Sequence, residues 1–142
     1  MTDRTGSCLC GAVRYRVSGD PVIARVCWCR HCQRIASNGT VNAVFPDTAL
    51  EVTGATSEYE RTADSGNKIR QRFCPQCGSQ LFGASTGRPG VTVVRMGTLD
   101  DPSSLRPTIN IWKKSAPVWA CVDDRLEGFE TQPVVPVPPT SS

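Results

Sequence analysis

The sequence predicts a mainly β fold in a single domain, and three observations support this prediction. First, 142 residues suffice for one domain with its own core but not comfortably for two. Second, short runs rich in β-branched and aromatic residues recur along the chain. Third, 12 glycines and 11 prolines interrupt these runs and leave little room for long helices. A hydrophobic fraction of 39% also excludes a disordered chain.

The expected strands follow from local patterns in chain order. Residues 12–17 alternate between apolar Val13, Tyr15 and Val17 on one face and arginines on the other, as a half-buried strand does. Further strands are expected at residues 22–26, 40–45, 50–53, 57–61, 69–73, 80–84, 91–96 and 108–112. Turn signals such as Gly19-Asp20-Pro21 separate them. Strands at this spacing are typical of an all-β sandwich, a barrel or a folded pair of sheets.

Helix is expected in only two places, as a turn or two after Cys29 and around residues 103–105. The last ten residues, 133–142, include four prolines, which cannot donate regular ladder hydrogen bonds. We therefore expect a domain at residues 4–130 and a proline-rich, flexible tail at 131–142.

The net charge and the hydropathy of the chain limit the kinds of partner that can be expected. Sixteen basic and 13 acidic side chains give a net charge of +3, without the dense basic stripe that nucleic-acid binding requires. Residues 1–45 carry six arginines against two acidic residues, which suits a small anionic partner or a solvated surface equally well. An apolar leader and an 18-residue apolar run are both missing, so a cytoplasmic protein without a membrane partner is expected.

Eight cysteines against one histidine make sulfur the expected carrier of the chemistry. Along the chain the cysteines fall into groups of two, three, two and one residues. These groups are Cys8 and Cys10; Cys27, Cys29 and Cys32; Cys74 and Cys77; and Cys121 alone. A C-x-x-C turn followed by glycine, as at residues 74–78, brings two sulfurs to about 3.8 Å, which tetrahedral zinc requires. A redox dithiol and a disulfide framework remain as alternatives, but the first favours a β-α-β context and the second needs export.

The number of cysteines in each group separates two kinds of zinc site. A structural zinc is closed by four protein ligands, whereas a catalytic zinc keeps three and leaves one position open. We therefore predict a closed site at Cys8, Cys10, Cys74 and Cys77 and an open, more labile site at Cys27, Cys29 and Cys32. Cys121 could close the second site, but it is expected to be a small core residue. His31 is expected to be an exposed loop residue, with a proton shuttle as the alternative.

Several motifs together resemble one known family. They are Gly6–Tyr15, the cysteine triplet with Gln33-Arg34, Arg72–Phe82, Gly97–Pro102, Ile111-Trp112 and Pro117–Trp119. In this order, over roughly residues 6–130, they resemble the glutathione-dependent formaldehyde-activating enzyme family, whose domain is shared with centromere protein V.

The resemblance implies a fold, a cofactor and an activity. The fold would be a zinc β-tent, in which mostly antiparallel sheets fold against each other and are stapled by zinc. Two zinc ions per chain are implied, a structural one on the two cysteine pairs and a catalytic one on the triplet. The implied activity is that of a zinc-dependent carbon–sulfur lyase. Such an enzyme forms S-hydroxymethylglutathione from a small thiol, glutathione, and an aldehyde, formaldehyde, or cleaves it back into the two.

Candidate substrate-binding residues lie close to the triplet. They are Arg30, Arg34 and Lys113, for carboxylates of a peptide thiol, and Trp28, as a pocket wall; Lys114 is a further cation, and Trp112 and Trp119 suit either wall or core. Trp28 and Asn110 occupy positions at which many relatives of this family carry histidine. Any function that those histidines have in the relatives is therefore absent from this chain or is performed by another residue. Two alternatives remain, a non-catalytic zinc-stapled β-tent that binds a protein partner and a zinc hydrolase acting on another small electrophile.

Overall fold

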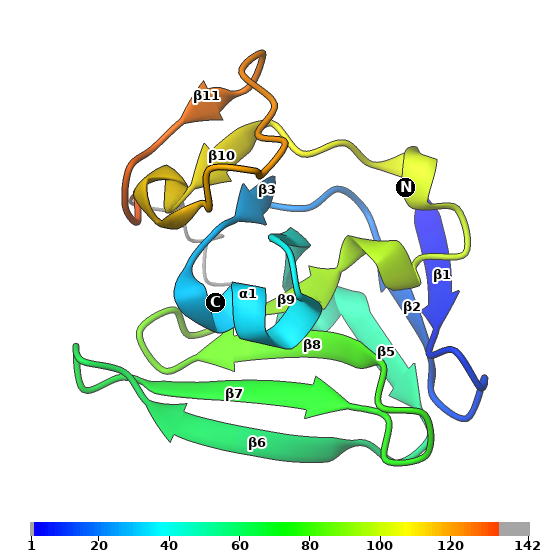
Figure 1. The fold of residues 1–142 in the computed structure, drawn as a ribbon. Helices are drawn as coiled ribbons and strands as arrows, with labels where there is room; N and C mark the ends of the chain where they lie inside the picture. Colours follow the sequence, from blue (N-terminus) through cyan, green and yellow to red (C-terminus); the bar gives the residue numbers. More distant parts are fainter. Residues whose placement is uncertain (1, 134–142) are drawn as a thin grey trace.

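The computed structural model describes residues 2–133 and arranges their strands in two sheets. Figure 1 shows the smaller sheet to one side of the molecule. It is antiparallel and contains β1 (Asp3–Ser7), β2 (Arg14–Ser18) and β5 (Leu50–Thr53) in the order β1-β2-β5. Of the tail predicted at 131–142, residues 134–142 lie outside the described part of the chain.

The larger sheet has the strand order β11-β10-β3-β4-β9-β8-β7-β6 within residues 2–133. Its strands are β3 (Ile23–Cys27), β4 (Thr40–Pro46), β6 (Ser57–Thr62), β7 (Lys68–Phe73), β8 (Gln80–Ser85), β9 (Val91–Arg95), β10 (Ile109–Ile111) and β11 (Glu127–Gly128). Neighbours pair antiparallel from β3 to β6, whereas β10 pairs parallel with both β3 and β11. All nine strands expected from the sequence are present, and the predicted mainly β, single-domain fold is confirmed.

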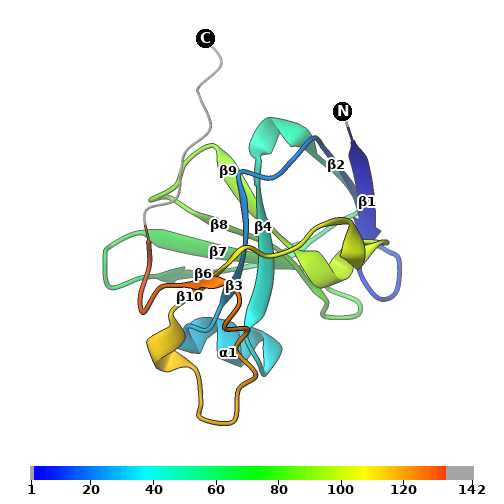
Figure 2. The same ribbon diagram turned by 90° about the horizontal axis from the view of Figure 1, so that it is seen from above.

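Helical structure is short, as expected. The α-helix α1 (Arg30–Ala36) follows Cys29, and Figure 2 shows it at the ends of β3 and β4. Single 3-10 turns occur at Asp47–Ala49, Met96–Thr98, Pro102–Ser104 and Lys113–Ser115. No helix within residues 2–133 is both long enough and apolar enough to cross a membrane.

The main core lies between the two sheets. Val13 and Val17 from the β2 region meet Phe45 of β4 and Phe82 of β8, and all four side chains are fully buried. The ring of Tyr15 packs edge-on against Phe82, with centroids 5.2 Å apart. Burying one such side chain contributes about 2 kcal/mol, so this contact fixes how the sheets fold against each other. Cys8 and Cys74 belong to the same core cluster.

Two strands were not expected from the sequence. β1 contains the polar run Asp-Arg-Thr-Gly-Ser and forms because its backbone pairs with β2 over five residues. The two-residue β11 pairs with β10 at the edge of the larger sheet. Neither segment has the apolar alternation by which a strand is recognised in a sequence.

Candidate metal centres

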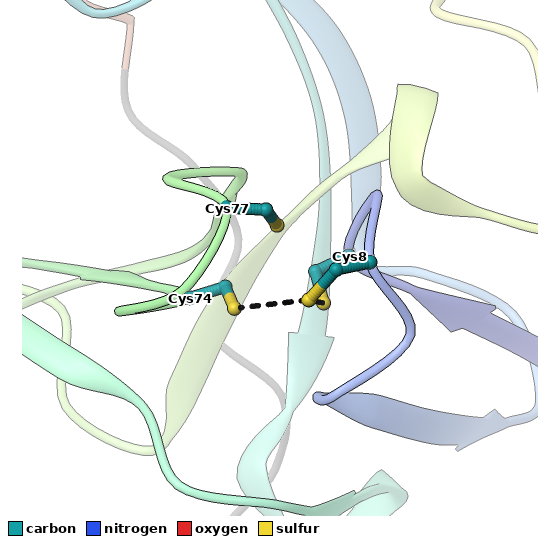
Figure 3. Close-up of side chains that lie close together, drawn as sticks. Cys8, Cys74 and Cys77 are labelled. Atoms are coloured by element: carbon teal, nitrogen blue, oxygen red, sulfur yellow. Dashed lines mark hydrogen bonds between the residues drawn. The ribbon is translucent and has the colours of Figure 1, made fainter.

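The first cysteine cluster joins the two sheets. Cys8 and Cys10 lie in the loop after β1, and Cys74 and Cys77 lie in the turn between β7 and β8. Figure 3 shows Cys8 facing Cys74 and Cys77. The four sulfurs all lie within 4.8 Å of one another. The Sγ atom of Cys10 is 3.6 Å from that of Cys8 and 3.7 Å from that of Cys74. A tetrahedral zinc with 2.3 Å bonds to sulfur needs separations of about 3.8 Å, so these four residues fit the ion.

Local hydrogen bonds explain why the 74–79 segment presents its sulfurs. The amide of Gly78 donates to the carbonyl of Cys74 (2.9 Å), and the left-handed backbone of Gly78 (φ 76°) completes the turn. The amide of Gln76 points at the Cys74 sulfur at 3.4 Å. The Ser79 hydroxyl, 3.2 Å from the Cys77 sulfur, lowers the pKa of Cys77 to about 5. Such donors favour the thiolate form that binds metal.

The second cluster is built where β3 meets α1. Cys27 ends β3, Cys29 caps the helix and Cys32 lies in its first turn, and their three sulfurs also lie within 4.8 Å of one another. The Cys29 sulfur accepts a hydrogen bond from the amide of Cys32 at 3.3 Å. Hydrogen bonds from the thiols of Cys27 and Cys32 lower the pKa of Cys29 to about 2. The cluster therefore holds one thiolate readily and can bind a cation with its other two sulfurs after they lose their protons.

The strands around this second cluster hold it rigidly. Ile111 of β10 lies opposite Cys27 in a parallel pair, and the Trp28 amide donates to the Ile111 carbonyl at 3.0 Å. Within α1, the Gln33 side chain donates to the carbonyls of Trp28 (2.8 Å) and Ser115 (2.9 Å). These bonds tie the helix to the turn after β10, so the positions of the three sulfurs depend on residues far along the chain.

A fourth protein ligand is not present at this cluster among residues 2–133. Cys121 belongs to neither cluster and is exposed, so the expectation that it is a small core residue is wrong. Trp119, beside it, is 68% exposed and is therefore not a core residue either. Residues 116–126 form no helix or strand that would press their apolar side chains onto a sheet. His31 is exposed as expected, but it lies on α1 rather than in a loop and outside the cluster.

The predicted substrate-binding residues are spread around the second cluster. Trp28 is only 4% exposed and packs against Gly39. Arg30 is exposed and donates to the Gln33 side chain. Lys113 is half-buried against Gly128 of β11.

Arg34 lies in a separate hollow of about 360 Å³. Its lining residues are His31, Arg34, Ile35, Tyr59, Arg61, Gln71 and Gln80. Positions 31, 34 and 35 share one face of α1, whereas positions 29 and 32 project from another. The hollow therefore opens beside the three-cysteine cluster and not directly onto it.

Three arginines that were not singled out from the sequence act electrostatically on this cluster. Arg25 of β3 is 3% exposed, and its burial lowers the pKa of its guanidinium to about 10, against the opposing effect of the nearby cysteines. Burial also lowers the pKa of Arg88 and that of Arg95, and the cysteine charges oppose this effect. The signal available in the sequence was Arg25 itself, a charge inside an otherwise apolar strand two residues before Cys27.

The fold and the clusters define a class of protein, a small two-sheet β protein with cysteine clusters that can hold zinc. A family model described as glutathione-dependent formaldehyde-activating enzyme matches residues 3–115. The chain belongs to this family, and the resemblance seen in the sequence is confirmed.

One relative carries the name of this family, and one solved structure has a similar fold. A Halomonas elongata protein named "Putative glutathione-dependent formaldehyde-activating enzyme" is 30% identical over 127 residues, which cover 84% of this chain and 81% of that protein. A Rhodobacter sphaeroides protein of known crystal structure superposes with a TM-score of 0.58 at 25% identity, over 70% of this chain and 93% of the other.

Proposed function

We propose that this protein is a zinc-dependent carbon–sulfur lyase that joins a thiol to an aldehyde, and separates them again, at the three-cysteine cluster. The observation that carries the proposal is a cluster of three sulfurs without a fourth protein ligand among residues 2–133. A zinc site of this kind keeps one position for substrate. The family to which the chain belongs supports glutathione and formaldehyde as the substrate pair.

Two zinc ions per chain have different roles in this proposal. The four-cysteine cluster would hold a structural ion, because it is complete and links the sheets. Cys27, Cys29 and Cys32 would hold the second ion, which when bound supplies a position for a soft thiolate or an aldehyde oxygen. Cys27, Cys32 and Ile111 are buried and keep water from most of this region.

The reaction balances without any further reagent. The thiol sulfur forms a bond to the aldehyde carbon, the carbonyl π electrons move to oxygen, and the thiol proton ends on that oxygen. The reverse reaction returns the same atoms. The role that remains for the protein is to align the two substrates and to exclude water.

Side chains on α1 and after β10 would position a peptide thiol. Arg34, which shares its hollow with Arg61, is suited to a carboxylate of the thiol. We propose Arg30 and Lys113 as further carboxylate contacts at the rim. Trp28, buried beside Cys27, would support the cluster from behind as a rigid wall.

The test is the rate at which glutathione and formaldehyde exchange with their adduct, measured by exchange NMR. We expect the wild-type protein to accelerate exchange and Cys32→Ser to abolish the acceleration while the fold is retained. Cys121→Ser is the matched control, because it removes a thiol outside both clusters. Equal rates with and without the wild-type protein, across several thiols and aldehydes, would overturn the proposal.

A second candidate function, a module that binds a protein partner, is favoured by one observation. Val118 is fully exposed and Trp119 is 68% exposed, so two large apolar side chains face solvent together. This function predicts that Trp119→Ala removes partner binding and leaves both metal ions in place. Acceleration of adduct exchange by the wild-type protein would contradict a purely non-catalytic role.

A further inference from the structure

The larger sheet places arginines in a row beside the three-cysteine cluster. Arg25 of β3 lies opposite Asn42 of β4, and Asn42 lies opposite Arg95 of β9. Directly paired residues project from the same face of a sheet, as do residues two apart on one strand. Arg25 and Arg95 therefore share the face from which Cys27 projects. The Arg95 guanidinium donates to the Asn42 side chain at 2.6 Å, which fixes this row.

A third arginine, which lies in a turn, acts electrostatically on Arg25 and on the cluster. Arg88 lies between β8 and β9, and its amide donates to the Ser85 carbonyl at 3.0 Å. Its positive charge contributes to lowering the pKa of Arg25, after the larger effect of burial, and the Cys27 charge acts on Arg88 in turn. Three guanidinium groups and the cysteine cluster are therefore close enough to interact electrostatically.

These arginines lack the partners that buried cations normally have. Within residues 2–133, none of the three has an Asp or Glu oxygen within 4.0 Å. Four of their buried N–H groups also have no hydrogen-bond acceptor in the described part of the chain, namely Nε and Nη1 of Arg25, Nη1 of Arg88 and Nε of Arg95. Buried charges and donors of this kind are retained where a partner neutralises them.

The cluster itself neutralises only part of this charge. Three thiolates and one divalent zinc ion leave a single negative charge, which faces three positive guanidinium groups. Two positive charges remain uncompensated. Arg88 and Arg95 are half-buried, whereas Arg25 is 3% exposed. A small anion beside the cluster would satisfy both the charge and the free donors.

We propose that Arg25, Arg88 and Arg95 form a carboxylate-binding site beside the three-cysteine cluster, so that an aldehyde with its own carboxylate, such as the 2-oxo acid glyoxylate, is a better substrate than an aldehyde without one, such as formaldehyde. The substrate assignment rests on the proposed lyase function, whereas the carboxylate site does not. The thiol sulfur adds to the aldehyde carbon, the thiol proton ends on the former carbonyl oxygen, and the carboxylate is unchanged.

The three arginines lie close to the cluster, and this short distance indicates that the carboxylate they bind belongs to the aldehyde and not to the thiol. Residues two apart on a strand have Cα atoms roughly 7 Å apart, so Arg25 lies close to the metal ligand Cys27. In a 2-oxo acid the carboxylate is bonded directly to the reacting carbon. In glutathione both carboxylates are many bonds from the sulfur, and the hollow around Arg34 is better placed for them.

Binding can be tested without any turnover. Acetate is the probe and acetamide its neutral isostere, each titrated into the zinc-loaded protein by calorimetry at constant ionic strength. We expect acetate to bind and acetamide not to bind. Because a hydrogen-bonded charge pair is lost, Arg88→Gln should weaken acetate binding by about tenfold or more. Arg16→Gln, on the smaller sheet, is the matched control and should bind acetate as the wild type does.

Arg88 lies in a turn, so this variant keeps the test valid even if Arg25→Gln fails to fold. Equal binding of acetate and acetamide, or unchanged acetate binding in Arg88→Gln, would overturn the carboxylate site.

A rate measurement then separates this inference from the proposed function. We expect glyoxylate to react with glutathione faster than acetaldehyde does on the wild-type protein, and Arg88→Gln to slow the reaction of glyoxylate more than that of acetaldehyde, so that the preference is lost. Acceleration with both aldehydes but no preference for glyoxylate would overturn the substrate assignment and leave the lyase function intact. Acetate binding without acceleration of any aldehyde would support the carboxylate site and overturn the lyase function.

Discussion

The reactivity expected of each cysteine depends on its immediate neighbours. Cys77 lies beside the Ser79 hydroxyl, which lowers its pKa to about 5, and the thiols of Cys27 and Cys32 lower the pKa of Cys29 to about 2. Cys121 is exposed and outside both clusters. The same side chain can therefore hold a metal ion in two places and is a solvent-facing thiol in a third.

Cys121→Ser tests whether the second cluster has a fourth cysteine ligand. We expect the variant to retain both zinc equivalents, because Cys121 lies outside the clusters in the described structure. The measurement is zinc per chain by elemental analysis after gel filtration. Loss of one equivalent would show that Cys121 completes the second site, and the substrate position would then be closed.

Tyr15 gives a stability prediction that depends on pH. Burial raises its pKa to about 12 from 10.0, so in the unfolded chain the tyrosine loses its proton first. The resulting contribution to the free energy of unfolding is complete below pH 10. It falls by about 1.4 kcal/mol per pH unit as the pH rises toward 12.

Tyr15→Phe should remove this alkaline loss. At pH 7 we expect it to lower the free energy of unfolding by about 1 kcal/mol, because the hydrogen bond between Tyr15 and Thr98 (2.7 Å) is lost. Urea unfolding at pH 7, 10 and 11.5 measures both effects. Parallel pH curves for the wild type and the variant would contradict the raised pKa.

At the scale of elements, α1 depends on one side chain for its attachment. Gln33 donates to the carbonyls of Trp28 and Ser115 and so joins the helix to the turn after β10. Gln33→Ala should lower the free energy of unfolding by about 1 to 3 kcal/mol, since two hydrogen bonds are lost and their acceptors are left without this partner. Urea unfolding measures this, with Arg34→Ala as the control on the exposed side of the same helix. Equal stability of the two variants would exclude the attachment.

The elements also show what a sequence can reveal. Strands such as 40–46 were predictable because their apolar composition reflects burial, and both cysteine clusters because ligand spacing reflects a turn. β1 was not predictable, because its polar residues form a strand only through pairing with β2. The row formed by Arg25 and Arg95 was not predictable for a similar reason, because it depends on the register in which β3, β4 and β9 pair.

At the scale of the whole molecule, the four-cysteine cluster connects the two sheets that enclose the core. Binding of a structural zinc ion contributes about 10 to 16 kcal/mol in small zinc domains, comparable with the whole stability of a typical domain. Cys74→Ser should therefore lose native near-ultraviolet circular dichroism at 25 °C. Cys32→Ser should keep it, because the three-cysteine cluster lies at the end of β3 and outside the main core cluster. Equal spectra for the two variants would contradict a structural role for only one cluster.

The most direct test of two unequal metal sites is the release of zinc during a chelator titration, followed together with circular dichroism. We expect two equivalents per chain, one released at low chelator concentration while the spectrum stays native and the other only as the protein unfolds. Release of both equivalents in a single step that coincides with unfolding, or a total of one equivalent per chain, would contradict the distinction between an open and a closed site.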